Sequence, residues 1–302
     1  MMTEDVAGLL VDYPEPEVAD PGPLFTYSSP DMPWLRRTVI RVVERLSGSG
    51  RFEKLYRHWQ ATRDPDAPIF SEAVRILGFD PQASEADMAH IPATGPLLIV
   101  ANHPFGIADG LSIGHLIAKV RPDVKLICHS LLCKPHEARG VLMPIDFGPG
   151  PEARRTSAET RRQAVEWLDQ GHALIIFPAG GVATSVTPFA RNASDFLWHP
   201  FVARLARRAG VQTLAIYVQG RNSRLFQLAS HLSYALRVSL IFHETRRRLN
   251  RTLWMRIAAP VECGAMEKGN VVAWLRARCY AMAEEGGPVA EDEFTFPARI
   301  QV

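Results

Sequence analysis

Residues 96–110 read PLLIVANHPFGIADG, and this stretch decides the fold. It contains an apolar run at 97–101, whose length and composition are typical of a buried strand. Pro104 and Gly106 then predict a tight turn, and Asp109 is a residue well suited to open a helix. The stretch therefore predicts a strand, a turn and a helix in direct succession, which is the repeating unit of an α/β fold.

From Ile91 onward, short apolar runs alternate with helical patterns in the same way. This alternation predicts an α/β domain with a mostly parallel central sheet flanked by helices. The predicted strands are 97–101, 124–128, 141–145, 173–177, 213–218, 238–242 and 253–257. The predicted helices of this region are 110–120, 152–170, 194–209 and 270–285.

The rest of the chain divides into three further regions. Residues 1–33 carry many prolines and acidic groups and predict an irregular arm. Helical patterns at 34–46, 51–62 and 69–77 predict an N-terminal helical cap at 34–90, ahead of the α/β domain at 91–285. We expect the C-terminal tail at 286–302 to be appended to the core. The helix at 34–46 is amphipathic, which suits packing on the body or lying on an anionic bilayer.

Composition limits the class of protein. The chain has 302 residues, 47% hydrophobic and 22% charged, which is typical of a globular protein with one large or two smaller domains. No apolar run reaches the roughly 18 residues that cross a bilayer, and the first residues lack the pattern of a signal peptide. We therefore expect a cytoplasmic protein that contacts membranes only from the surface. Four cysteines in a chain of this length favour reduced thiols.

Arginines cluster although the formal net charge is only +2. Such clusters can attract the phosphates of a cofactor, a lipid surface or a nucleic acid, although a solvated helix face is the better explanation for any single pair. The clusters are Arg36-Arg37, Arg154-Arg155, Arg161-Arg162, Arg207-Arg208 and Arg246-Arg247-Arg248.

His103 and Asp109 are the candidate catalytic pair. A carboxylate on one imidazole nitrogen fixes the tautomer and leaves the other nitrogen free to take a proton from a hydroxyl or an amine. Each residue also has a structural explanation, because Asp109 is a good helix N-cap and His103 can simply end a strand. Together, at the end of a buried strand, they predict a general base.

Two other predicted strands end in segments that suit ligand binding. Phe177-Pro178-Ala179-Gly180-Gly181 offers backbone amides that could line an anion or an oxyanion, and Gly220-Arg221-Asn222 offers a guanidinium and an amide. Ligands gather at the carboxyl ends of the strands in such sheets. The candidate binding residues are therefore Asn102, Gly106, Phe177, Pro178, Gly180, Gly181, Arg221 and Asn222.

Metal and nucleotide chemistry lack their motifs. Cys128, His129, Cys133 and His136 are suitable zinc ligands, but their spacing follows no zinc template, so no metal is predicted. Neither a P-loop nor a dinucleotide-binding glycine pattern is found. No resident cofactor is therefore expected.

These motifs resemble those of the glycerolipid acyltransferase superfamily, which contains the glycerol-3-phosphate and lysophosphatidate acyltransferases. Asn102-His103 followed by Asp109 stands for the first family motif, and Phe177-Pro178-Ala179-Gly180 stands for the third, Phe-Pro-Glu-Gly-Thr-Arg. The resemblance covers about residues 91–261. It looks closest to a bacterial branch labelled as hemolysin or lysophospholipid acyltransferase-like.

The resemblance implies transfer of a fatty acyl group from acyl-CoA or acyl carrier protein to the hydroxyl of a lysophospholipid or lyso-aminolipid. His103 would deprotonate the acceptor, Asp109 would orient His103, and no acyl-enzyme would form. Amides at Gly180 and Gly181, or Asn102, would stabilise the oxyanion. The implied partners are a lipid substrate, the cytoplasmic face of the inner membrane and acyl carrier protein, with no nucleic acid. The implied process is phospholipid biosynthesis.

The chain departs from the family pattern at charged positions. Ala179 and Val182 replace the glutamate and arginine of the third motif. The second motif corresponds to residues 142–147, where Phe147 replaces the arginine that usually follows its Ile-Asp pair. In the family those charges help to hold glycerol phosphate, so the resemblance implies a different acceptor or substitute arginines. Arg221 is the first candidate for such a substitute, and Arg154 and Arg155 are the next.

The spacing of the first motif also departs from the family. Five residues separate His103 from Asp109, where four are common, so the loop must bulge to keep the pair in contact. Two other functions remain open at this point. One is N-acylation of an amine, which would use the same base, and the other is a catalytically silent lipid-binding protein, which the depleted third motif would suit. A membrane-lytic protein has no support, because no long apolar segment could form a pore.

Overall fold

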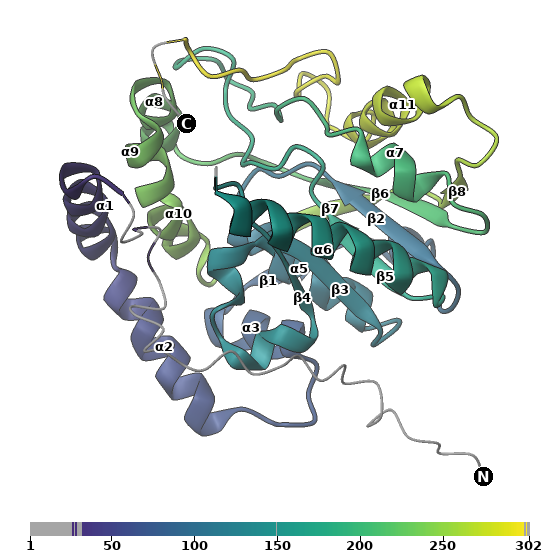
Figure 1. Cartoon of the computed structure of the whole chain (residues 1–302), viewed down its shortest axis with the longest axis horizontal. Coiled ribbons are helices and arrows are strands. Elements are labelled where there is room, and N and C mark those ends of the chain that lie inside the picture. Colours follow the sequence, from purple (N-terminus) through teal and green to yellow (C-terminus); the bar gives the residue numbers. More distant parts are fainter. Residues whose placement is uncertain (1–25, 27, 29–31, 149, 299, 301–302) are drawn as a thin grey trace.

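The structure is a computed structural model, and it describes residues 26, 28, 32–148, 150–298 and 300. The arm expected at 1–33 lies almost entirely outside the described residues. The rest forms a central sheet with helices on both faces (Figure 1). Each described helix is too short or too polar to cross a bilayer.

Eight strands form one mostly parallel sheet. They are β1 (Asp80–Gln82), β2 (Leu97–Ala101), β3 (Val124–His129), β4 (Leu142–Ile145), β5 (Ala173–Ile176), β6 (Gln212–Val218), β7 (Thr252–Ile257) and β8 (Val261–Glu262). Their order is β1-β7-β6-β2-β5-β3-β4, and β8 pairs with β6. Strand β6 runs antiparallel to β7 and β8, and the other pairs are parallel. The predicted α/β class is confirmed.

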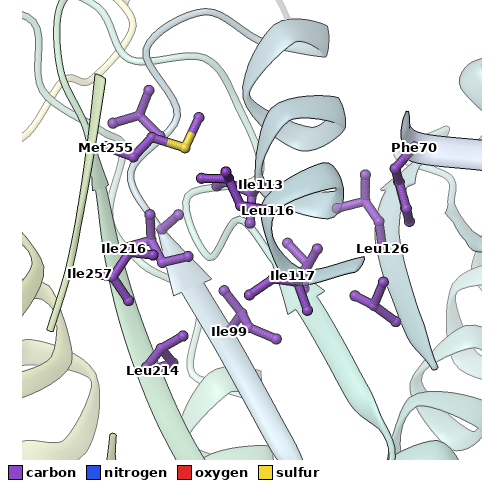
Figure 2. Packing of buried hydrophobic residues seen from close by; sticks show 14 of the residues in the cluster. Phe70, Ile99, Ile113, Leu116, Ile117, Leu126, Leu214, Ile216, Met255 and Ile257 are labelled. Atoms are coloured by element: carbon purple, nitrogen blue, oxygen red, sulfur yellow. The ribbon is translucent and has the colours of Figure 1, made fainter. Parts of the chain in front are cut away.

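Strand β2 lies in the middle of the sheet, and its side chains alternate between two cores. Leu97, Ile99 and Ala101 pack with α3 (Ile69–Leu77) and α5 (Ile107–Ala118) on one face. Figure 2 shows Ile99 beside the α5 side chains of this core. Leu98 and Val100 pack with α6 (Pro151–Asp169), α7 (Phe201–Ala206) and α11 (Lys268–Tyr280) on the other. All five residues of β2 are fully buried, so the end of this strand is a rigid support for the turn that follows.

Five of the remaining described helices form a layer beside the sheet: α1 (Trp34–Ser47), α2 (Ser49–Thr62), α8 (Arg224–Leu232), α9 (Tyr234–Ser239) and α10 (Ile241–Arg248). The short helix α4 (Glu85–Met88) packs against β7. Helix α1 packs against α9 and α10, and Gly48 joins it to α2 with a positive φ of 95°. Ile40, Phe52, Val238 and Phe242 form the small core between these helices. Short 3-10 turns at Ser130–Cys133 and His136–Gly140 follow β3.

Two predicted elements are wrong. The strand predicted at 238–242 spans the end of α9 and the start of α10, because its apolar residues face the helical core around Phe52. A short apolar run fits a buried helix face as well as a strand. The helix predicted at 194–209 is confirmed only at 201–206, because Ser194 forms an antiparallel bridge with Thr184 and Pro200 precedes the helix.

The C-terminal tail packs onto the body of the protein through Phe294, whereas the sequence led us to expect 286–302 to be appended to the core. Phe294 is 1% exposed and packs edge-on against Phe196. Its amide donates to the carbonyl of Asp195, and the Arg276 side chain donates to the carbonyl of Asp292. The tail therefore closes over the loop between β5 and α7.

Candidate active site

The end of β2 is locked to its neighbour by Asn102. Its side-chain oxygen accepts from the Val218 amide at 2.7 Å, and its side-chain amide donates to the Val218 carbonyl at 2.9 Å. Both hydrogen-bonding groups of Asn102 are therefore used in joining β2 to β6. Asn102 therefore fixes the backbone next to His103. The sequence suggested that Asn102 binds an oxyanion, but its side chain is occupied by these two hydrogen bonds.

The turn after β2 brings Asp109 to His103. Asp109 is fully buried in the first turn of α5, and its Oδ2 accepts from the amides of Phe105 and Gly106 at 2.8 and 3.0 Å. The same oxygen lies 3.0 Å from His103 Nδ1. Gly106 has a φ of 77°, a conformation that glycine adopts without strain, and this turn accommodates the extra residue between the pair.

The imidazole of His103 lies on the wall of a cavity. Its side chain is 17% exposed, and its ring stacks on Phe177 with centroids 3.9 Å apart. The contact with Asp109 is close, although it is not aligned as a hydrogen bond. Catalytic contacts often tighten only when substrate binds. Because Asp109 faces Nδ1, the Nε2 atom is the one available to accept a proton.

Asp195 supports the backbone of His103 and was missed by the sequence analysis. Its carboxylate accepts from the His103 amide at 3.1 Å and from the Trp198 indole at 2.9 Å. Burial raises the pKa of the Asp195 carboxyl, while these donors and Arg276 oppose the rise. A lone aspartate 92 residues beyond His103 carries no sequence signal of this contact.

The cavity has a volume of about 660 Å³ and is mainly apolar. One part lies between α2, α3 and α5, where Trp59 and Phe70 contribute to the wall. Another lies against α9 and α10, and a third extends toward Phe147 and Phe201. A mainly apolar cavity with a few polar groups suits an aliphatic chain whose reactive end lies at His103.

The third predicted motif also forms part of the cavity wall. Phe177, Pro178, Gly180 and Gly181 all line the cavity, as Gly106 does. The Gly180 amide donates to the Phe177 carbonyl at 3.0 Å, so it closes a turn and is not free for an oxyanion. Among the described residues, the Gly181 amide has no acceptor. Gly181 is therefore the better candidate of the two.

The arginines that the sequence pointed to lie elsewhere. Arg221 donates to the Ala190 carbonyl, and neither it nor Asn222 lines the cavity. Arg154 and Arg155 do not line it either. In the part of the chain that the structure describes, the arginines on the cavity wall are Arg161 and Arg237, which differ from the three expected from the sequence.

Two other groupings of reactive side chains do not form a site. Cys128 and Cys133 have their Sγ atoms 3.6 Å apart, but the described residues hold no cluster of three or more groups that could bind a metal. Residues 110–114 read GLSIG, which matches the serine-hydrolase elbow pattern. They lie inside α5, however, and Ser112 is fully buried, so this serine is not a nucleophile.

Comparison with known proteins adds a family to this geometry. A family model described as Acyltransferase matches residues 33–245, which include every residue of the site described above except Arg276. A similar curated protein is the lyso-glycine lipid O-acyltransferase of Phocaeicola vulgatus, 21% identical over 197 residues. The aligned region covers 62% of this chain and 66% of that protein, so it spans just under two thirds of the relative.

Proposed function

The chain belongs to the acyltransferase family, and from that premise we propose that it transfers a fatty acyl group from a thioester to the hydroxyl of a lysolipid. The observation that carries the proposal is the His103–Asp109 pair on the wall of a large, mainly apolar cavity. The cavity would hold the aliphatic chains, and the pair would supply the base. Asp109 and His103 then have the roles that the sequence resemblance implied.

The proposed reaction is a direct transfer. His103 Nε2 takes the proton of the acceptor hydroxyl, and the oxygen attacks the carbonyl carbon of the thioester. Asp109 stabilises the imidazolium that forms, as a carboxylate does in hydrolase triads. The tetrahedral intermediate collapses, the C–S bond breaks, and the leaving thiolate takes the proton back from Nε2. A positioned base of this kind contributes roughly 10²–10⁴-fold to a rate.

The proposed acceptor is a single-chain lipid with a polar headgroup. The similar Phocaeicola protein is named for a lyso-glycine lipid, which supports a lyso-aminolipid, and a lysophospholipid is the alternative acceptor. The proposed donor is acyl-CoA or acyl carrier protein, used as a co-substrate. Neither choice requires a cofactor held by the protein.

We also propose that the enzyme works as a peripheral protein on the cytoplasmic face of the inner membrane. Trp34 and Leu46 at the two ends of α1 are 71% and 78% exposed, and Leu35 and Val42 between them are also exposed. Large apolar side chains on an outer helix face suit contact with lipid. Helix α1 packs on α9 and α10, two helices that form part of the cavity wall.

The proposal is tested with purified protein, long-chain acyl-CoA and acyl carrier protein donors, and a panel of matched acceptors. The panel contains lysophospholipids, hydroxylated lyso-aminolipids and their amine analogues, with the products read by mass spectrometry. New ester-linked two-chain lipids support the proposal. Amide products alone would replace it with N-acylation, and binding without turnover with either donor would replace it with a silent lipid-binding protein.

A further inference from the structure

A buried charged group lies on the cavity wall, and the proposed reaction does not use it. Arg237 belongs to α9, is 4% exposed and lines the same cavity as His103. Burying a guanidinium is costly unless its charge is compensated. Its surroundings therefore indicate what it is for.

The hydrogen-bond partners of Arg237 among the described residues are all neutral. Its Nη1 donates to the hydroxyls of Thr184 and Ser230, the latter at 2.7 Å, and its Nη2 donates to the Val182 carbonyl. A guanidinium carries five N–H donors, so these bonds use three of them. No carboxylate among the described residues forms an ion pair with it.

Aromatic rings supply the rest of its environment. The guanidinium carbon lies between 4.9 and 5.8 Å from the ring centres of Phe196, Phe226, Phe294 and Phe296. Burial lowers the pKa of Arg237 to about 9, so it still carries its charge at neutral pH. Ring faces attract a cation, but they neutralise no charge, so Arg237 remains a positive group without a counter-ion.

Arg237 is also linked to His103 by hydrogen bonds through residues 182–184. The Ala183 amide donates to the His103 carbonyl at 2.7 Å. Its neighbours Val182 and Thr184 accept the hydrogen bonds from Arg237. One three-residue segment therefore contacts both the backbone of His103 and the guanidinium of Arg237.

The acidic group on this cavity wall is held in another way. Asp146 follows β4, and its carboxylate accepts from the Gly148 amide at 2.8 Å and from the Ser130 hydroxyl at 3.4 Å. Among the described contacts it does not pair with Arg237. Among the described residues, Arg237 is therefore a buried cation without a counter-ion.

We propose that Arg237 binds the anionic group, a carboxylate or a phosphate, of the acyl acceptor's headgroup. This inference rests on the proposed function and adds the charge of the substrate to it. The two free N–H groups match the two oxygens of such an anion. Pairing with the ligand would compensate the buried charge, so an anionic headgroup should be strongly preferred over a neutral one.

The test is a binding experiment that needs no acyl donor. N-lauroylglycine, dodecyl phosphate and neutral N-lauroylglycinamide are titrated into the full-length protein and followed by tryptophan fluorescence. We expect the wild type to bind at least one anionic ligand at least tenfold more tightly than the neutral one, and the tighter ligand identifies the carboxylate or the phosphate. Arg237→Gln should remove this preference and leave the affinity for the neutral ligand within about twofold.

Two further variants make the result specific. Arg237→Lys keeps the charge without the planar fork and should retain part of the preference. Arg204→Gln removes an exposed arginine on α7 and should behave as the wild type. A preference that survives in Arg237→Gln would overturn the inference.

Other outcomes are equally decisive. A wild type that binds the three ligands equally well would contradict the inference even if Arg237→Gln did not fold. If Arg237→Gln lost as much affinity for coenzyme A as for the anionic ligand, the arginine would be assigned to the acyl donor and the proposal would be overturned. Because binding is measured without a thioester, a failure of acyl transfer would refute the proposed function and leave this result standing.

Discussion

At the scale of single residues, Asp109 is held by the turn that it closes. Its Oδ2 accepts from the Phe105 and Gly106 amides and also faces His103 Nδ1. An asparagine at this position could keep the bonds to the amides, because its carbonyl oxygen still accepts. It would turn an amide donor or a neutral oxygen toward the imidazole, and the charge that stabilises the imidazolium would be lost.

We therefore predict that Asp109→Asn lowers kcat by roughly 10³–10⁴-fold while the protein remains folded. The measurement is steady-state kinetics beside the thermal midpoint. Asp66→Asn, an exposed aspartate in a turn, is the matched control and should change neither quantity. A variant that keeps more than a tenth of wild-type kcat would show that Asp109 only caps α5.

Asp123 gives a prediction about pH and stability. Burial would raise the pKa of its carboxyl, but hydrogen bonds from Arg121 and His172 outweigh this effect and hold the pKa below its usual value. A lowered folded pKa stabilises the protein above the unfolded pKa of about 4, and this stability is lost as the pH falls through the folded pKa.

Asp123→Asn should therefore be less stable than the wild type at pH 7, and the difference should narrow as the pH falls below about 4. Urea unfolding of both proteins at pH 7, 4 and 3 measures it. A difference in the free energy of unfolding that stays constant over this range would contradict the assignment.

The sequence could predict residues whose role depends on local chain order. His103, Gly106 and the third motif follow strands closely and line the cavity, and Asp109 in the helix after the turn contacts His103. Asp195 and Arg237 could not be predicted, because their roles depend on contacts with segments 92 and 53 or 55 residues away. Arg221 failed for the same reason, since its contact with Ala190 turns it away from the cavity.

At the scale of elements, α3 forms part of the cavity wall beside α5. Ala73 is a half-buried residue of α3 that lines the cavity. Neighbouring wall residues include Trp59 and Phe70, so this part of the cavity is apolar. If an acyl chain occupies it, a larger side chain at position 73 should shorten the space available.

We predict that Ala73→Phe shifts the preferred acyl group to shorter chains, with at least a tenfold loss of kcat/KM for the longest substrates and little change for the shortest. Each buried methylene contributes about 0.8 kcal/mol, so two excluded methylenes suffice for this loss. The measurement is kcat/KM against a series of acyl-chain lengths. Gly50→Ala, an exposed position in α2 with open space around it, is the control. Equal losses at every length would argue against this location of the chain.

Strands were predictable wherever an apolar run met a turn signal. Strand β2 matches its prediction in full, and the other long strands differ by one residue at an end. Strand β1 could not be found, because its three residues, Asp80–Gln82, pair with β7 and carry no apolar pattern. Residues 238–242 show the opposite failure, in which apolar residues that bury a helix look like a strand.

At the scale of the whole molecule, apolar side chains gather on outer helices. Besides the exposed residues of α1, helix α8 exposes Leu225, Leu228 and Leu232. Helix α9 contacts both helices and also lines the cavity. Arg41 and Arg45 on α1 are exposed as well, so this surface combines apolar and basic groups.

We predict that the double variant Leu35→Ser and Leu46→Ser weakens binding to anionic vesicles several-fold, because it removes apolar area that would enter the lipid. Its thermal midpoint and its activity on a short-chain substrate in solution should stay unchanged. Cosedimentation with vesicles measures the binding. Wild-type binding by the double variant would place the membrane contact elsewhere.

The fold class was predictable because it depends on the alternation of strands and helices along the chain. The packing of the C-terminal tail was not predictable, because Phe294 is buried by segments distant in sequence, including Phe196 and His231. The aromatic side chains that enclose Arg237 come from three parts of the chain in the same way. The headgroup site proposed for this arginine is therefore visible only in the folded molecule.

The most direct test of the account is the rate of acyl transfer from a long-chain thioester to a lysolipid by wild type, His103→Ala and His58→Ala. His58 is an exposed histidine of α2 away from the cavity, so its variant controls for the substitution itself. The account predicts full activity in His58→Ala and a loss of at least about 10³-fold in His103→Ala, with equal thermal midpoints. Undiminished transfer by folded His103→Ala would contradict the central claim.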